Sequence, residues 1–240
     1  MRRSRVLSVG SFLPARVVTN KELEERVKTS DDWIRERTGI RQRHVAAEGE
    51  LTSDLAAAAA KDALAKAQFP VEKLQAIVVA TTTPDETFPS TACYVQHKLG
   101  ARGGPAFDLQ AACCGFVYAL ATADALVTSG QVDNALVIGA ETFSRILDWE
   151  DRGTCILFGD GAGAVLLQAE ENGKQGVLAS VLHADGAITG ILKTTGGVSS
   201  TKTAGIVAMQ GREVFRHATV KMGEAMVEAV ERAGVPSMVW

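Results

Sequence analysis

The sequence lacks the features that mark several large classes of protein. It has no apolar run long enough for a membrane-spanning helix, and the basic start at residues 1–5 leads only into a short apolar segment. The net charge of its 240 residues is only −3, so no basic surface for nucleic acid is indicated. These absences argue against a signal peptide, a membrane protein and a nucleic-acid-binding protein. We expect a globular enzyme or binding protein of the cytoplasm.

Cysteine is also scarce, with four residues at positions 93, 113, 114 and 155. No Cys-x-x-Cys pair and no closely spaced pair of histidines accompanies them, so the sequence indicates neither a metal site nor a dithiol redox centre. A disulfide scaffold needs more cysteines than this, and neighbours such as Cys113 and Cys114 rarely bridge. We therefore expect reduced thiols and no metal ion.

Short apolar runs alternate along the chain with segments of helical periodicity. The runs predict strands at residues 6–10, 76–81, 135–139 and 176–183 and near Phe107. The periodic segments predict helices at residues 52–66, 90–99, 116–129 and 213–233, and a capping box at Thr19 and Glu22 begins a shorter one. This alternation predicts a layered α/β fold, with an exposed loop at residues 194–205.

Residues 107–130 are the stretch around which the chain is organised. An apolar run leads to Cys113, Cys114 and Gly115, and the helix that follows is apolar almost all round, which predicts a buried helix that Gly130 ends. The N-terminus of a helix carries partial positive charge and free N–H groups, which lower the pKa of a thiol placed there. Cys113 is therefore a candidate nucleophile. Cysteines also commonly fill space in a core, and this stretch alone leaves both interpretations open.

Two further patterns allow a functional and a plain interpretation. Trp33 and Arg37 are four apart on a helix that Ser30 would cap, which suits a stacking platform beside an anion-binding guanidinium, although the spacing alone favours an ordinary surface cluster. The glycines of residues 159–163 are spaced by two and lead into a strand-like run. A dinucleotide fingerprint needs G-x-G-x-x-G before a helix, so we expect tight turns at a cavity edge instead.

Seven stretches, taken together and in order, carry a resemblance to a known family. They lie at residues 29–43, 79–82, 88–90, 106–116, 151–163, 182–186 and 211–215. In this order and spacing they resemble β-ketoacyl-acyl carrier protein synthase III, the initiating condensing enzyme of type II fatty acid synthesis. The resemblance implies a thiolase-like fold of two similar layered α/β halves, usually as a homodimer. Here these halves would be residues 1–172 and 173–240, the second of them incomplete.

The resemblance also implies roles for individual residues. Cys113 would accept an acetyl or other short acyl group from acyl-CoA, and Cys114 would be a packing residue. Trp33 and Arg152 would sandwich the CoA adenine. The other implied contacts are Thr29 and Arg37 along the nucleotide, Phe88 toward the partner subunit's acyl pocket, Phe143 and Leu157 in the acyl pocket, Gly211 and Phe215 beside the pantetheine channel, and Arg216 toward an acidic carrier protein. Acyl-CoA and malonyl-loaded acyl carrier protein are the implied partners, and no cofactor is implied.

The sequence departs from the family pattern in one respect. In the family a histidine in a Pro-His-Gln-Ala-Asn motif and a later asparagine stabilise the enolate of the condensation step, and both are expected beyond Trp240. None of the four histidines of this sequence matches that position. Three alternatives stay open: another thiolase-like starter-unit synthase, a non-catalytic fragment that binds acyl-CoA or a partner subunit, and a redox protein that uses Cys113 and Cys114.

Overall fold

The computed structural model describes residues 2–171 and 175–236, which fall into two compact units. The first unit comprises residues 1–16, 45–142 and 160–180, and the second comprises residues 17–44, 143–159 and 181–240. The chain therefore passes from one unit to the other several times. The predicted boundary between residues 172 and 173 lies outside the described residues.

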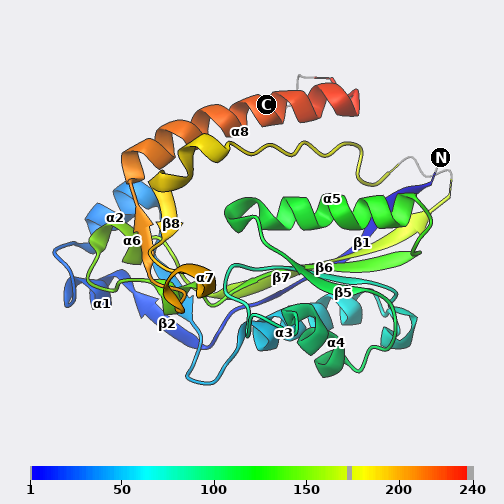
Figure 1. Ribbon diagram of the computed structural model, residues 1–240, viewed down its shortest axis with the longest axis horizontal. Helices are drawn as coiled ribbons and strands as arrows, with labels where there is room; N and C mark the ends of the chain where they lie inside the picture. The colour runs from blue at the N-terminus through cyan, green and yellow to red at the C-terminus, as the bar shows by residue number, and fades with distance from the viewer. Residues whose placement is uncertain (1, 172–174, 237–240) are drawn as a thin grey trace. The chain divides into compact units, whose positions relative to one another are not determined.

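A five-stranded mixed sheet forms the centre of the first unit (Figure 1). Its order is β1 (Arg3–Phe12), β7 (Gly161–Glu170), β6 (Asn134–Glu141), β4 (Ile77–Ala80) and β5 (Ala106–Leu109). β4 runs parallel to both β5 and β6, whereas β7 is antiparallel to β1 and β6. All four residues of β4 are buried, as expected for a central parallel strand that is covered on both faces.

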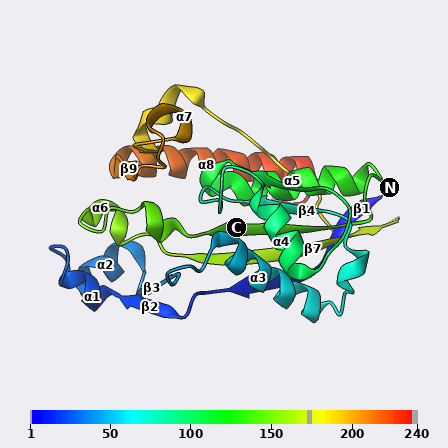
Figure 2. The same cartoon turned by 60° about the horizontal axis from the view of Figure 1, so that its bottom comes forward.

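Helices cover both faces of this sheet. α3 (Thr52–Lys66) and α4 (Thr91–Leu99) pack on one face, and α5 (Gly115–Thr128) packs on the other (Figures 1 and 2). The alanines of α3 allow a close approach to β1, where a Cβ added at Gly10 would lie 2.2 Å from the backbone oxygen of Ala59. The three-residue helix η1 (Val71–Lys73) leads into β4.

The helix after the cysteines is less buried than its composition predicts. Within α5 only Gly115, Ala119, Ala123 and Val127 are buried, at the spacing of one helical face, and Val117 is 47% exposed. The prediction of a fully buried helix is therefore wrong, because the first unit covers only the face that packs on the sheet. Gly130 has a φ of 78° just after the helix, as the predicted C-terminal signal requires.

The second unit contains short elements and one long helix. Its N-terminal part holds a two-stranded sheet of β2 (Arg16–Thr19) and β3 (Gln42–Val45), with α1 (Asn20–Glu24) and α2 (Asp31–Thr38) between them. The predicted capping box of Thr19 and Glu22 is present, and Ser30 caps α2 through the N–H of Trp33. The remaining elements are η3 (Phe143–Ile146), α6 (Arg152–Cys155), η4 (Gly186–Ile191), β8 (Leu192–Thr194), α7 (Val198–Thr201), β9 (Val207–Met209) and α8 (Gly211–Ala233).

Three local predictions need correction. Residues 176–183 form no strand, although the N–H of Val177 donates to the backbone oxygen of Ser4 at the edge of the sheet. The predicted loop at residues 194–205 includes the short helix α7. Gly159 has no positive φ, and its role is close packing, since an added Cβ would lie 2.9 Å from the backbone oxygen of His44.

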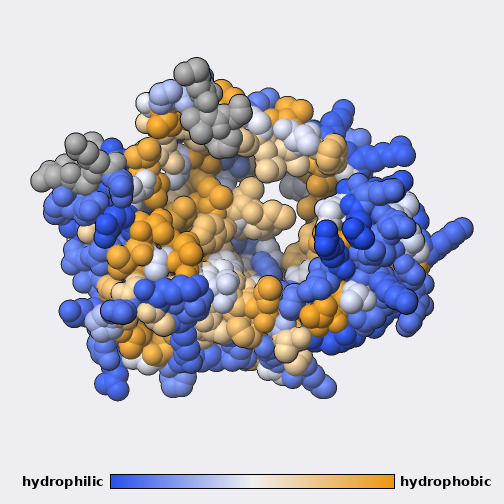
Figure 3. Space-filling model, turned by 180° about the vertical axis from the view of Figure 1, so that it is seen from behind, coloured by the Kyte–Doolittle hydropathy of each residue, from blue (hydrophilic) through white to orange (hydrophobic). Residues whose placement is uncertain are grey.

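Many apolar side chains remain at the surface (Figure 3). α8 has no buried residue in its whole length, and Phe215, Met222 and Met226 lie along one of its faces with exposures of 72%, 64% and 49%. No helix in the described part of the chain has the length and apolarity needed to cross a membrane.

Candidate active site

The proposed nucleophile lies at the carboxyl edge of the parallel strands of the first unit. The chain leaves β5 at Leu109, forms the short turn η2 (Ala112–Cys114) and enters α5 at Gly115. The side chains of Cys113 and Cys114 are both exposed. The interpretation of Cys113 as a core-filling residue therefore does not hold, and the expected packing role of Cys114 is wrong as well. This is the position that the sequence predicts, at the mouth of a helix.

The backbone of this turn is strained and tightly packed. Ala112, directly before Cys113, has a φ of 45°, a conformation that costs a non-glycine residue about 1–2 kcal/mol. A Cβ at Gly115 would lie 3.3 Å from the Cβ of Ala80, so glycine lets α5 begin close against β4. Strain of this kind gathers at functional sites.

Two carboxylates at this edge were not singled out from the sequence. Asp108 on β5 accepts hydrogen bonds from the N–H groups of Thr91 and Ala92, at 2.6 and 2.8 Å, and so fixes the N-terminus of α4 beside β5. Glu141 ends β6, and burial raises the pKa of its carboxyl group. Asp108 is the last residue but one of β5 and Glu141 is the last residue of β6, and this placement near the ends of apolar parallel strands was the signal available in the sequence.

The second unit brings Trp33 and Arg152 together. The guanidinium carbon of Arg152 lies 4.7 Å from the centre of the Trp33 ring, and Nη1 of Arg152 donates to the backbone oxygen of Lys28 at 3.0 Å. Arg37 lies over the same ring, 4.4 Å from its centre. Both distances are within the range of cation–π contacts. The structure therefore places two cations on one half-buried indole.

Thr29 lies four residues before Trp33, and the environment of its hydroxyl group is unusual. Its Oγ1 atom is buried and has no hydrogen-bond partner among the described residues. A buried hydroxyl without a partner costs free energy, so this atom marks a position where a ligand or water would be accepted.

Of the two predicted acyl-pocket residues, Phe143 belongs to an apolar cluster and Leu157 does not. The rings of Phe143 and Phe158 pack with their centres 4.6 Å apart, beside Ile146, Leu147 and Val207. Leu157 is half-buried and is not a member of that cluster.

The remaining predicted residues have little packing of their own. Gly211 begins α8, and Phe215 one turn later is 72% exposed. Arg216 is exposed and pairs with Glu213 of the same helix at 2.7 Å. In the first unit Phe88 is 82% exposed, on the loop between β4 and α4.

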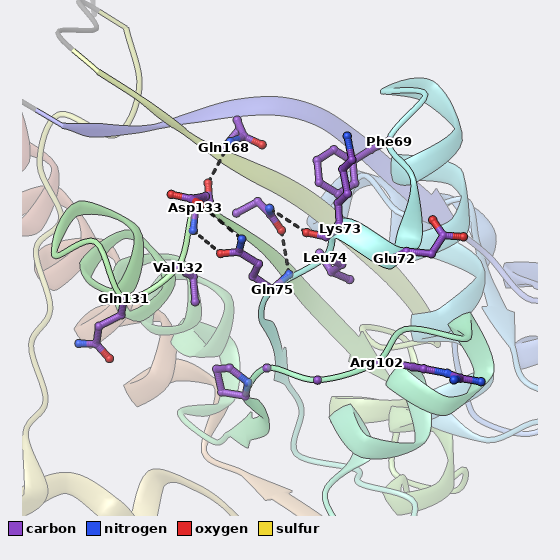
Figure 4. A pocket seen from close by; sticks show the side chains of 14 residues that line it. Phe69, Glu72, Lys73, Leu74, Gln75, Arg102, Gln131, Val132, Asp133 and Gln168 are labelled. Atoms are coloured by element: carbon purple, nitrogen blue, oxygen red, sulfur yellow. Dashed lines mark hydrogen bonds between the residues drawn. The ribbon is translucent and has the colours of Figure 1, made fainter.

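A pocket of 620 Å³ lies at the opposite, amino edge of the same sheet (Figure 4). Its polar groups bond to one another: Gln75 and Asp133 are joined through the Gln75 side chain, and the amide of Asn134 bonds to backbone groups of Lys73 and Gln75. Because Gln75, Asp133 and Asn134 already satisfy one another and nearby backbone groups, these three residues offer a ligand few free hydrogen-bonding groups. No cluster of metal-binding side chains occurs in the described ranges.

Comparison with known proteins gives one consistent result. The sequence model of the 3-oxoacyl-[acyl-carrier-protein (ACP)] synthase III family matches residues 107–186. The β-ketoacyl-[acyl-carrier-protein] synthase III of Rhodospirillum rubrum is 58% identical over 240 residues, which cover 98% of this chain and 74% of that protein. The crystal structure of the synthase III from Aquifex aeolicus is 46% identical with a TM-score of 0.90, covering 97% of this chain and 72% of that one.

A polyketide enzyme is also similar, at lower identity. The priming β-ketosynthase of a polyketide biosynthetic pathway is 32% identical with a TM-score of 0.84, over 99% of this chain and 80% of that one. The predicted thiolase-like fold is confirmed, and the identities favour the fatty acid enzyme over the polyketide, non-catalytic and redox alternatives. The chain belongs to the β-ketoacyl-[acyl-carrier-protein] synthase III family, the acyltransferases that initiate fatty acid synthesis.

Proposed function

We propose that Cys113 is the residue that carries the acyl group in this reaction. The thiolate of Cys113 attacks the carbonyl carbon of acetyl-CoA or another short acyl-CoA. The bond from that carbon to the CoA sulfur breaks, and CoA leaves with the proton that Cys113 has lost. The single observation that carries the proposal is the exposed Cys113 side chain on a strained turn at the mouth of α5.

The oxyanion that forms during this attack needs donors in fixed positions. The backbone N–H of Cys113 is the candidate from this chain, at the turn that precedes α5. A preorganised donor of this kind typically contributes on the order of 10²–10³ in rate. The exposed Cys114 would take no part in the chemistry.

The nucleotide end of the CoA substrate is assigned to four residues, Trp33, Arg37, Arg152 and Thr29. The indole of Trp33 and the guanidinium of Arg152 would sandwich the adenine, and Arg37 offers positive charge along the nucleotide. The buried Thr29 hydroxyl supports this assignment, because it would gain the hydrogen bond that it lacks. No cofactor is needed for either bond change.

In the second half of the reaction malonyl-loaded acyl carrier protein would lose CO₂, and its carbanion would attack the acyl-Cys113 thioester. The new carbon–carbon bond would release the Cys113 thiolate and leave acetoacetyl-carrier protein. Arg216, exposed near the start of α8, is the proposed contact for the acidic carrier protein. Phe143 and Leu157 would line the acyl pocket, and Gly211 and Phe215 would border the pantetheine arm.

We further propose that the protein acts as a homodimer in the cytoplasm. Phe88 is an exposed phenyl ring on a short loop, and such a ring is a typical anchor for a partner subunit. All four cysteines are free thiols, which suits a reducing compartment.

Intact mass spectrometry tests the assignment of Cys113. The folded protein should gain one acetyl group when it is incubated with acetyl-CoA, and so should the Cys114→Ser variant. The Cys113→Ser variant should gain none. An acetyl group that persists on Cys113→Ser, or no adduct at all on folded wild-type protein, would contradict the proposal.

A further inference from the structure

Glu141 occupies an unusual place for a carboxylate. It is the last residue of β6, at the carboxyl edge of the parallel strands. Its Oε1 atom accepts the backbone N–H of Thr82 at 2.8 Å. Its Oε2 atom accepts the hydroxyl groups of Thr82 and Thr83 at 2.9 and 2.5 Å. One side chain therefore holds two consecutive residues through both of its oxygen atoms.

Thr83 extends this arrangement into a buried network. Its Oγ1 atom accepts the N–H of Thr142 at 2.9 Å, and its backbone oxygen accepts the hydroxyl of Thr52 at 2.6 Å. The hydroxyls of Thr52 and Thr142 lie 2.9 Å apart, and the N–H of Thr83 donates to Oγ1 of Thr81. Thr52, Thr81, Thr83 and Thr142 are all buried. The corner at residues 81–83, where the chain leaves β4, is thus fixed from several directions.

This corner lies between Glu141 and the nucleophile segment. β4 has β6 on one side and β5 on the other, with Ala80 paired to Gly139 and to Leu109. The N–H of Thr81 continues the pairing to β5 by donating to the oxygen of Leu109 at 3.3 Å. Four residues after Leu109 comes Cys113, and α5 begins against Ala80.

The partners of Glu141 are all neutral. No ion pair with Glu141 occurs in the described part of the chain. A half-buried carboxylate without a cation is costly, and a neutral side chain at the end of β6 would avoid that cost. What the carboxylate supplies is three acceptor contacts with two threonines, a geometry that apolar side chains cannot provide.

We infer that Glu141 is a positioning residue for Cys113, because it fixes the corner at residues 81–83 against which the nucleophile turn is built. This inference rests on the proposed role of Cys113. Small displacements at a reacting atom have large effects, and a shift of 1 Å can cost about 10²-fold in rate. Loss of the hydrogen bonds from Thr82 and Thr83 to Glu141 should therefore slow the chemistry of Cys113 without weakening the binding of acyl-CoA.

The test compares two carboxylates at the two ends of the same strand. Glu141→Gln removes the charge at the end of β6, and Asp133→Asn is the matched control just before its start. For each protein the acetylation of Cys113 is followed by intact mass over a range of acetyl-CoA concentrations. Glu141→Gln should lower the limiting rate constant about tenfold, the effect of one lost charge-assisted hydrogen bond, and leave the half-saturating concentration within about twofold. Asp133→Asn should change neither quantity.

A second pair of variants covers the case in which Glu141→Gln does not fold. Thr83→Val removes a hydroxyl with little change of shape, and Thr83→Ser keeps it. Thr83→Val should slow acetylation about tenfold and Thr83→Ser should be close to wild type. Limiting rate constants that stay unchanged in Glu141→Gln and Thr83→Val would overturn the inference, even if both variants melt at lower temperature.

Alkylation of Cys113 by iodoacetamide separates this inference from the proposed function. If wild-type protein is not acetylated, the proposed function fails. The alkylation rate still reports the position and reactivity of the Cys113 thiol. Slower alkylation in Glu141→Gln than in Asp133→Asn would support the positioning role. Equal alkylation rates in those two variants would overturn it.

Discussion

The guanidinium of Arg152 lies directly on the indole of Trp33, 4.7 Å from the ring centre, and is held there by the backbone oxygen of Lys28. A base between two planar groups needs roughly 7 Å, twice the usual carbon contact distance. Adenine can therefore stack on this face of Trp33 only if Arg152 moves. The contact keeps Arg152 and Trp33 next to each other. In this position the guanidinium occupies the place that the adenine would take.

Arg152→Ala should weaken the interaction with acyl-CoA and leave the chemistry at Cys113 unchanged. The half-saturating acetyl-CoA concentration should rise about tenfold, since the contact that Arg152 would make with the bound adenine contributes about 1–2 kcal/mol, and the limiting acetylation rate should stay the same. Arg26→Ala is the matched control, because Arg26 lies over another indole of the same unit, that of Trp149, at 5.4 Å. Equal effects of the two variants on the half-saturating concentration would contradict the assignment of Arg152.

Phe88→Ala should weaken self-association without destabilising the fold. The Phe88 ring is 82% exposed, so its removal leaves no cavity in the core of the first unit. We expect the dimer dissociation constant from sedimentation equilibrium to rise at least tenfold, as for a truncated aromatic anchor. Leu136→Ala, at a fully buried position, should instead lower the free energy of unfolding by about 2–5 kcal/mol. A Phe88→Ala protein that associates as wild type does would rule out an anchoring role.

The stability of Glu141→Gln relative to wild type should change with pH in a defined direction. Burial raises the pKa of Glu141 above its ordinary value of 4.5, so the folded protein holds this proton more tightly than the unfolded chain does. The stability from this group is present below pH 4.5 and is lost as the pH rises through the folded pKa. Glutamine cannot ionise, so the variant should gain stability relative to wild type as the pH rises.

Asp133→Asn should show the opposite trend in the same urea unfolding series. The hydrogen bond from Arg2 holds the pKa of Asp133 below its ordinary value of 3.8. This group therefore stabilises the fold above pH 3.8, and its contribution is lost as the pH falls through the folded pKa. Parallel pH profiles for the two variants would contradict the environments that the structure gives these two carboxylates.

Asp108→Ala should destabilise the first unit by about 1–3 kcal/mol, because it leaves the N–H groups of Thr91 and Ala92 without their acceptor. Asp108→Asn should recover part of this loss, since its amide oxygen can still accept one of the two bonds. Urea unfolding of the three proteins at pH 7 measures both differences. Equal stability of Asp108→Ala and wild type would show that water replaces the carboxylate at no cost.

The sequence by itself determined the local structure of most of the chain. The capping residues Thr19 and Ser30 and the stop at Gly130 are all found where they were predicted. These signals act within one or two turns of backbone, so no distant residue is needed to interpret them. The motifs in order also determined the family, and the proposal of Cys113 as the nucleophile, in preference to the neighbouring Cys114, rests on the same motifs.

Only the tertiary structure decided which distant residues meet. The family resemblance pairs Trp33 with Arg152 around adenine, but nothing in their spacing predicts that the guanidinium rests on the indole itself, because that contact depends on how α2 and α6 pack. The exposed side of α5 and the missing strand at residues 176–183 were mispredicted for the same reason. Apolar composition permits burial, but a side chain is buried only where another element covers it. The hydrogen bonds from Thr82 and Thr83 to Glu141 likewise exist only because β4 and β6 end at the same edge of one sheet.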